Sequence, residues 1–320
     1  MISVIIICAY FGNLPGCYDT WLYSCKFNST IDFLLITDQD VNNTPNHVHV
    51  IKMTFKEVQL LTDNTIGRHV SLDYPYKLCD LKPLYGVMFE KYLIGYDYWG
   101  HCDMDLVFGN IRGFLNKYHL ENYDKFLDLG HLSLYRNTKE NNQRFKDEGS
   151  KCGSWIDVIT DINGYAFDER NGIYQIYLYN KYSQFDRRIY ADISTIYRRF
   201  RCALDDVNYD QQVFYWENGK IYREYWENNK KKKEEFIYIH FKKRGFNKPE
   251  FDLLNTKAFY IGPNGFTKKI NETNLSDVKQ INPFQGKFYE KQELYCFKIK
   301  EFIVKLKRKL NKVLKSGGTV

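Results

Sequence analysis

The sequence YDYWGHCDMDLVFG, residues 96–109, predicts a short apolar β-strand that ends in two carboxylates, Asp103 and Asp105. Side chains on an extended backbone alternate between two faces, so both carboxylates can point to one side while Met104 turns into the core. Proteins hold Mg²⁺ and Mn²⁺ with one or two carboxylates and complete the shell with water and phosphate oxygens. The pattern therefore predicts Mn²⁺ or Mg²⁺ with a phosphorylated ligand, although an acidic turn without a metal has the same pattern.

Upstream of this stretch, the chain alternates between strand and helix patterns. Residues 2–10 form a nearly continuous β-branched run, residues 17–27 fit a helix, and residues 31–38 form a second apolar run. This alternation predicts a parallel sheet of an α/β fold, whose ligands bind beyond the carboxyl ends of the strands. The side chains expected there, as contacts for a nucleotide, are Tyr10, Thr37 and Asp38. Asp38 fits a helix cap or a turn equally well.

A cationic segment, residues 76–89, precedes the Asp-x-Asp strand. It places two lysines and an aspartate just before a predicted helix. A lysine at a helix start is unfavourable with the helix dipole unless an anion binds there. We therefore expect nucleotide contacts from Lys77, Asp80 and Lys82. The alternative is a salt-bridged surface turn with Pro83 in the first helical turn.

A second informative stretch, FIYIHFKKRGFNKP, spans residues 236–249. An apolar strand ends there in a single histidine, His240, and a cluster of cations follows. His240 is a third candidate metal ligand, although a lone histidine is more often a core residue. The cations expected to neutralise a diphosphate are Lys242, Lys243, Arg244 and Lys248.

Two acidic clusters are candidates for a catalytic carboxylate. They comprise Asp168 and Glu169 in the first, and Asp206 and Asp210 in the second. A carboxylate in either cluster can act as a general base or accept hydrogen bonds from sugar hydroxyls, while most acidic pairs are simply solvated.

The later part of the chain changes character. Residues 213–240 predict aromatic hairpins, with Asn218 and Gly219 in a tight turn and the run Lys230–Lys233 in a solvated loop. Residues 294–315 place apolar side chains at helical spacing with Lys and Arg between them, which predicts a basic amphipathic helix. Such a helix either lies on an anionic membrane or packs its apolar stripe onto the rest of the protein. The sequence leaves both alternatives open.

Length and composition limit the possible classes of protein. A chain of 320 residues with 44% hydrophobic content can form a large core, and no apolar run reaches membrane-spanning length. Without a signal-peptide pattern, we expect a cytoplasmic protein. The eight cysteines are scattered, which predicts reduced thiols. A net charge of +7 without a sustained basic stripe argues against a nucleic-acid partner.

Taken together, these motifs resemble glycosyltransferases with the GT-A fold, and among them bacterial enzymes of capsule and lipopolysaccharide assembly. The likeness rests on the first apolar strand, residues 77–83, Asp103-x-Asp105, and His240 with Gly245, Lys248 and Pro249. In the related family that includes glycogenin and lipopolysaccharide galactosyltransferases, Asp-x-Asp binds Mn²⁺ with the donor diphosphate. A His-x-x-Gly-x-x-Lys-Pro motif adds the third protein ligand and a phosphate-binding lysine. This chain departs from that spacing, with four residues rather than two between His240 and Gly245.

The resemblance implies a Rossmann-like mixed sheet, mainly parallel and flanked by helices, in a catalytic domain at residues 1–266. Its nucleotide-binding part would span about 1–110 and its acceptor part about 111–266, followed by a C-terminal extension at 267–320. The implied reaction moves a sugar from a nucleotide diphosphate sugar, a UDP-sugar, to a hydroxyl of a glycan or lipid-linked glycan. A lipid-linked acceptor would place the protein at the inner face of the cell membrane. A metal-dependent phosphohydrolase or nucleotidyltransferase acting on sugar nucleotides is the alternative.

Overall fold

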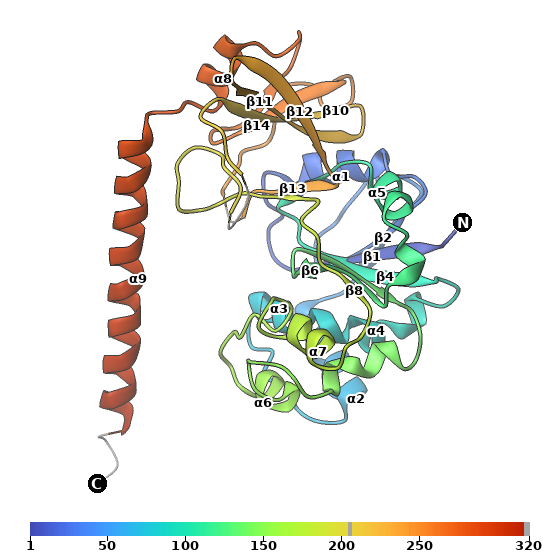
Figure 1. Cartoon of the computed structure of the whole chain (residues 1–320). Helices are drawn as coiled ribbons and strands as arrows, with labels where there is room; N and C mark the ends of the chain where they lie inside the picture. The colour runs from blue at the N-terminus through green and yellow to red at the C-terminus, as the bar shows by residue number, and fades with distance from the viewer. Residues whose placement is uncertain (204–206, 243, 317–320) are drawn as a thin grey trace.

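A seven-stranded sheet with helices on both faces forms the larger part of this computed structural model (Figure 1). The strand order is β3-β2-β1-β4-β7-β6-β8. β1 pairs in parallel with β2 and β4, as does β2 with β3, whereas β7 is antiparallel to both of its neighbours. The predicted α/β fold with parallel strands is thus confirmed. The strands are β1 (Val4–Tyr10), β2 (Asp32–Thr37), β3 (Val48–Lys52), β4 (Tyr98–Cys102), β6 (Lys125–Leu129), β7 (Leu132–Arg136) and β8 (Gln184–Phe185).

The structure describes residues 1–203, 207–242 and 244–316. For residue 305 and residues 307–316, only the backbone is described. Within these ranges, no helix combines the length and the apolar character needed to cross a lipid bilayer.

Strand β1 is central because both of its faces are apolar. Ile6 and Cys8 pack towards Trp21 in one core, and Ile5 and Ile7 pack into a second core on the opposite face. One helical layer consists of α1 (Tyr18–Lys26) and α5 (Ile111–Lys117). The other consists of α2 (Phe55–Ile66), α3 (Leu78–Leu81), α4 (Tyr85–Met88), α6 (Trp155–Thr160) and α7 (Ile173–Tyr179). Continuous β-branched runs buried on both faces are typical of such a three-layer arrangement.

A three-stranded sheet adjoins the end of β4. It has the order β5-β13-β9, with β13 antiparallel to β5 and parallel to β9. Its strands are β5 (Leu106–Phe108), β9 (Ala191–Asp192) and β13 (Tyr238–His240). Because β4 and β5 are separated only by residues 103–105, the Asp-x-Asp segment is a short, direct connection between the two sheets.

The remaining named strands form an antiparallel five-stranded sheet in the order β12-β11-β10-β14-β15. It contains β10 (Gln212–Glu217), β11 (Lys220–Glu227), β12 (Lys230–Phe236), β14 (Ala258–Gly262) and β15 (Gly265–Lys268). The predicted aromatic hairpins are confirmed, but the prediction of a loop at Lys230–Lys233 is wrong. These lysines begin β12, where ion pairs form with acidic residues of β11. One example is the 3.1 Å pair of Lys231 with Glu224.

Two helices follow the five-stranded sheet. α8 (Leu275–Ile281) packs on it through the buried Val278. α9 (Lys287–Ser316) then runs beside the rest of the molecule as a long separate rod (Figure 1). The prediction of a helix at residues 294–315 is confirmed.

Candidate metal centre and adjoining cavity

Three potential metal ligands converge where the large sheet meets the three-stranded sheet. Met104 is buried, and the flanking Asp103 and Asp105 remain partly exposed. His240 ends β13 and pairs with Leu106 of β5, so the strand register brings its ring next to Asp105. The distance from His240 Nε2 to Asp105 Oδ1 is 3.3 Å. One ligand atom from each of Asp103, Asp105 and His240 lies within 4.8 Å of the others.

This donor set fits a divalent metal ion. Two carboxylates suit a hard cation, and an imidazole nitrogen beside them favours a transition metal such as Mn²⁺ over Mg²⁺. Burial lowers the pKa of His240, but hydrogen bonds with Asp105 and Asp192 outweigh it and raise the pKa to about 10. The imidazolium therefore supplies positive charge between the two carboxylates, and a metal bound at Nε2 would displace its proton.

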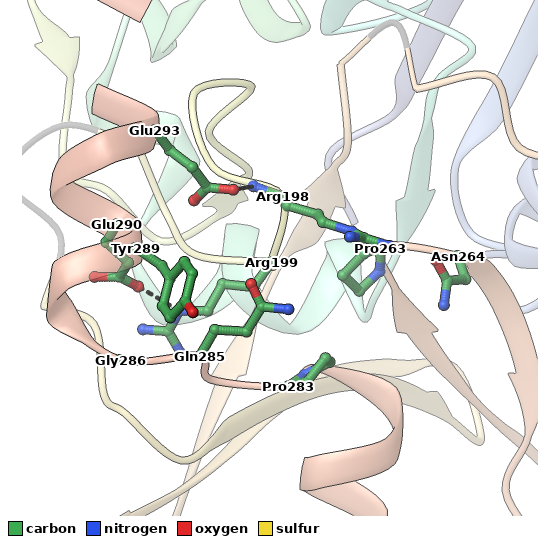
Figure 2. Close-up of a pocket in the computed structure, with 10 residues that line it drawn as sticks. All are labelled: Arg198, Arg199, Pro263, Asn264, Pro283, Gln285, Gly286, Tyr289, Glu290 and Glu293. Atoms are coloured by element: carbon green, nitrogen blue, oxygen red, sulfur yellow. Dashed lines mark hydrogen bonds and ion pairs between the residues drawn. The ribbon is translucent and has the colours of Figure 1, made fainter. Parts of the chain in front are cut away.

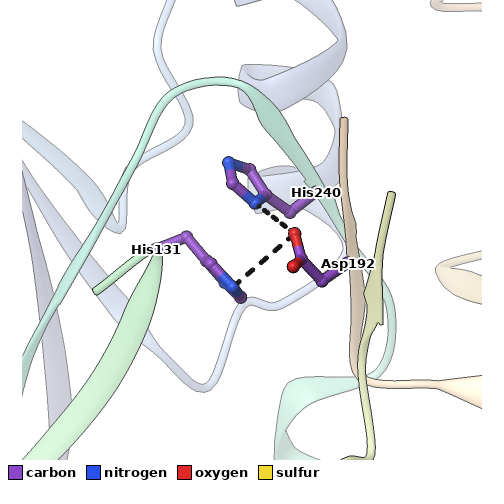
Figure 3. A group of neighbouring side chains, drawn as sticks. All are labelled: His131, Asp192 and His240. Carbon is purple, nitrogen blue, oxygen red and sulfur yellow. Dashed lines mark hydrogen bonds and ion pairs between the residues drawn. The ribbon is translucent and has the colours of Figure 1, made fainter. Parts of the chain in front are cut away.

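Asp192, which the sequence analysis did not single out, lies next to Nδ1 of the His240 ring (Figure 3). It ends β9 beside His240, and its Oδ1 accepts a hydrogen bond from His240 Nδ1 at 3.0 Å. Its Oδ2 lies 2.8 Å from Lys242 Nζ. Burial would raise the pKa of Asp192, but the hydrogen bond from His240 and the nearby cations hold it well below the usual range. A carboxylate in this place orients a metal-binding imidazole.

His131 is a second residue that the sequence analysis missed. It lies in the turn between β6 and β7, and its carbonyl oxygen accepts from the Asp103 amide at 3.0 Å. Its ring stacks on His240 with centroids 4.3 Å apart, and its Nδ1 is bonded to the Tyr238 hydroxyl at 2.7 Å. His131 Nε2 has no hydrogen-bond partner and lies 3.9 Å from Asp192 Oδ1 (Figure 3). Together, His131, Asp192 and His240 form a second group with metal-binding potential.

Lys82 is a buried cation that is hydrogen-bonded to Asp103. Its Nζ donates to Asp103 Oδ1 at 2.6 Å, to the Gly130 carbonyl at 2.9 Å and to Asp168 Oδ2 at 3.0 Å. Burial lowers the pKa of Lys82, but the carboxylates, Asp103 foremost, raise it well above its usual value. Lys82 thus stays charged and ties the Asp-x-Asp segment to the loop that carries Asp168.

Lys77 and Asp80 require a correction. Both side chains are buried, with Lys77 Nζ 2.8 Å from Asp80 Oδ2 and 2.8 Å from the Val158 carbonyl. Asp80 also accepts from the backbone amides of Tyr165 and Phe167. These contacts use the charges inside the protein, so the pair supports the loop before Asp168 and does not face a nucleotide.

A cavity of about 310 Å³ adjoins the centre. Its lining includes His240, Asp192, His131 and Glu169. Cationic side chains also line it, namely Arg170, Arg188 and Lys242. Burial, and then the charge of Asp168, raise the pKa of Glu169 to about 7. Burial raises the pKa of Asp168 to about 6, against the opposing charge of Lys82.

The nucleotide contacts predicted at the carboxyl edge of the parallel strands, Tyr10, Thr37 and Asp38, differ from one another in their surroundings. Tyr10 is partly buried at the end of β1. Asp38 accepts from the Gly12 amide at 3.0 Å, which links the segments that follow β1 and β2. Thr37 is fully buried, so its side chain is not exposed for the predicted nucleotide contact.

The remaining predicted site residues lie away from the metal ligands or outside the described residues. Arg244 donates to the carbonyls of Ser194 and Tyr197, which uses its guanidinium within the protein. Lys248 is exposed, 3.4 Å from Asp19. The exposed Asp210 has its carbonyl bonded to Arg199, beside the start of α9. The residues outside the described ranges are Asp206 and Lys243.

These features define a mixed α/β protein with a carboxylate–histidine centre at a junction of two sheets. The chain belongs to DUF6625, a family of unknown function whose model matches residues 6–270. Among curated proteins, no match to the chain is found.

Two solved structures similar to the chain are the glycosyltransferase GlyE of Streptococcus pneumoniae TIGR4 and its apo form, each with a TM-score of 0.32 and 12% sequence identity. The matches cover 58% of this chain but only 45% and 46% of the GlyE chains. The chain thus corresponds to less than half the length of those structures.

Proposed function

We propose that this protein is a GT-A-type, metal-dependent glycosyltransferase. It moves a sugar from a nucleotide diphosphate sugar, a UDP-sugar, to an acceptor hydroxyl in the synthesis of a bacterial surface polysaccharide. The acceptor class rests on the resemblance of its motifs to capsule and lipopolysaccharide enzymes. The observation that carries the proposal is the convergence of Asp103, Asp105 and His240 beside a cavity that also contains carboxylates and cations.

The protein's own residues divide into those that hold a cation and those that hold the ligand's negative charge. Asp103, Asp105 and His240 Nε2 would hold Mn²⁺ or Mg²⁺, with Asp192 keeping the imidazole in the required orientation. When bound, such an ion neutralises the charge that develops on a leaving nucleoside diphosphate. Lys242, at the cavity wall, is placed to attract the same diphosphate.

Glu169 is the carboxylate best placed to act as a general base towards the acceptor hydroxyl. It lines the cavity, and its pKa of about 7 matches the ideal for proton transfer near neutral pH. Asp168 is less suited because its Oδ2 is already bonded to Lys82 and lies against Gly130. We assign Asp168 to positioning, and the unpartnered His131 Nε2 to a hydrogen bond with the ligand in the cavity.

The experiment that tests the function combines binding with product analysis. UDP-, GDP-, CMP- and dTDP-sugars are screened by thermal shift with Mn²⁺ and with EDTA. A ligand at a hundred times its Kd should stabilise the native state by about 2.7 kcal/mol. We expect a UDP-sugar to raise the Tm only with Mn²⁺, and the products to contain UDP and a glycosylated acceptor.

Matched variants make the result specific. Asp105→Asn and His240→Ala should lose the Mn²⁺-dependent shift, while Asp186→Asn, which changes an aspartate bonded to the Tyr174 hydroxyl, should retain it. Release of a nucleoside monophosphate and a sugar phosphate without an acceptor would favour the phosphohydrolase alternative. Unchanged Mn²⁺-dependent binding in Asp105→Asn would refute the proposed centre.

A further inference from the structure

The long helix α9 carries a stripe of exposed apolar side chains. Its members, spaced seven, four, three and four residues apart, occupy one face of a helix with 3.6 residues per turn. They are Phe288 (68% exposed), Tyr295 (68%), Ile299 (42%), Phe302 (65%) and Leu306 (47%). Isolated apolar residues are common on surfaces, but a continuous row of this length indicates an interaction site.

The opposite face of α9 holds the helix to the protein. Glu290 binds Arg199, and the carboxylate of Glu293 accepts from the Arg198 amide at 3.0 Å (Figure 2). Glu290 also binds Arg201. A small cavity of about 90 Å³ lies between these first turns and the loop carrying the arginines. Glu293 and Tyr295 are separated by about 200° of helix rotation, so the stripe points away from this attachment.

This arrangement contradicts one of the two alternatives from the sequence, namely that the helix packs its apolar stripe onto the rest of the protein. A helix that packed its apolar stripe onto the catalytic part would bury Tyr295, Ile299 and Phe302, and here all three are exposed. The half-buried residues near the attachment are instead Leu294 and Phe297. The stripe is therefore available to a partner outside the chain.

Charge indicates what that partner is. Ten of the 46 Lys and Arg residues and three of the 39 Asp and Glu residues lie in α9, so this helix alone accounts for the chain's formal net charge of +7. Lys291 and Lys298 are exposed beside the stripe. A second copy of so basic a helix would be repelled, and a nucleic acid would leave the apolar stripe unused.

We propose that α9 binds the surface of an anionic lipid bilayer. The stripe from Phe288 to Leu306 enters the boundary between headgroups and acyl chains, and the flanking lysines contact lipid phosphates. Because the first turns are fixed to the protein through Glu290 and Glu293, binding also sets the orientation of the body on the membrane. This inference does not depend on the proposed glycosyl transfer.

The full-length protein is tested by sedimentation with vesicles of phosphatidylcholine alone and of phosphatidylcholine mixed with phosphatidylglycerol, at low and high salt. We expect about tenfold stronger binding to the anionic vesicles at low salt, and a loss of that preference at high salt. Phe302→Ser and the double variant Lys291→Gln/Lys298→Gln should each weaken binding several-fold. The matched control is Val304→Ser, which removes an exposed apolar side chain from the opposite face.

Thermal unfolding of each variant checks that the fold is intact, which is expected because the replaced side chains are exposed. Binding that is equal for neutral and anionic vesicles, or equal in Phe302→Ser and Val304→Ser, would overturn the proposal. So would a concentration-dependent dimer that Phe302→Ser dissociates, together with absent vesicle binding. That result would assign the stripe to a second copy of the chain.

Discussion

Asp192 Oδ1 accepts a hydrogen bond from His240 Nδ1 at 3.0 Å, and this pairing leaves His240 Nε2 directed at Asp105. The two residues are neighbours in the parallel register of β9 and β13, although 48 positions separate them in the chain. The carboxylate therefore determines which ring nitrogen is available to a metal. Fixing the tautomer and orientation of the ring is the usual role of a carboxylate behind a metal-binding histidine.

Asp192→Asn should weaken Mn²⁺ binding by about 10- to 100-fold, because the amide does not hold the imidazole as a carboxylate does. Isothermal titration with MnCl₂ measures the change, and Asp186→Asn is the matched control. An affinity equal to that of the unmodified protein would show that Asp192 has no part in metal binding.

Lys82→Met should lower the free energy of unfolding by about 3–5 kcal/mol at neutral pH, because it leaves the buried carboxylate of Asp168 and the partly exposed carboxylate of Asp103 without their cation. Urea denaturation in EDTA measures the loss. Adding Asp168→Asn to Lys82→Met should recover part of it, since one uncompensated charge is removed. Additive losses in the double variant would contradict the assignment of Lys82 as the charge partner of Asp168.

Gly130→Ala should destabilise the protein by about 1–3 kcal/mol, since its new Cβ would lie only 2.0 Å from Asp168 Oδ2. Asp168 cannot easily move away, because Lys82 holds it. Thermal unfolding gives the change, and donor affinity should fall with it. Gly164→Ala is the control: its Cβ would meet nothing closer than the Tyr74 hydroxyl at 3.9 Å, so its stability should stay within about 0.5 kcal/mol.

Glu169 should make the stability of the metal-free protein depend on pH. Its pKa is about 7 in the folded protein and near 4.5 when unfolded, so between these values the native state binds more protons. The contribution of Glu169 to stability is therefore present below about pH 4.5 and is lost as the pH rises to 7. Glu169→Gln should remove this loss and be more stable than the unmodified protein at pH 7.5, by about 1–2 kcal/mol, relative to their difference at pH 5. Parallel stability curves of the two proteins across this range would contradict the prediction.

The sequence by itself determined those strands and helices that a short, continuous run of residues specifies. The β-branched run in β1 and the strand-helix-strand alternation up to β2 predicted the parallel part of the sheet, because a strand buried on both faces needs apolar side chains at every position. The basic amphipathic helix followed from its period in the same way. The sequence grouped Asp103, Asp105 and His240 because polar side chains next to the ends of apolar strands can meet, and the three side chains do converge.

Only the tertiary structure decided which polar residues surround that centre. Asp192 ends a two-residue strand, and His131 lies in a turn, so neither has a periodic pattern around it. Lys77 and Lys82 have the same local signal, yet one supports a distant loop and the other binds Asp103. Strand register and long-range ion pairs make these differences, and a pattern read along the chain contains no information about residues that are far apart in sequence and brought together by folding.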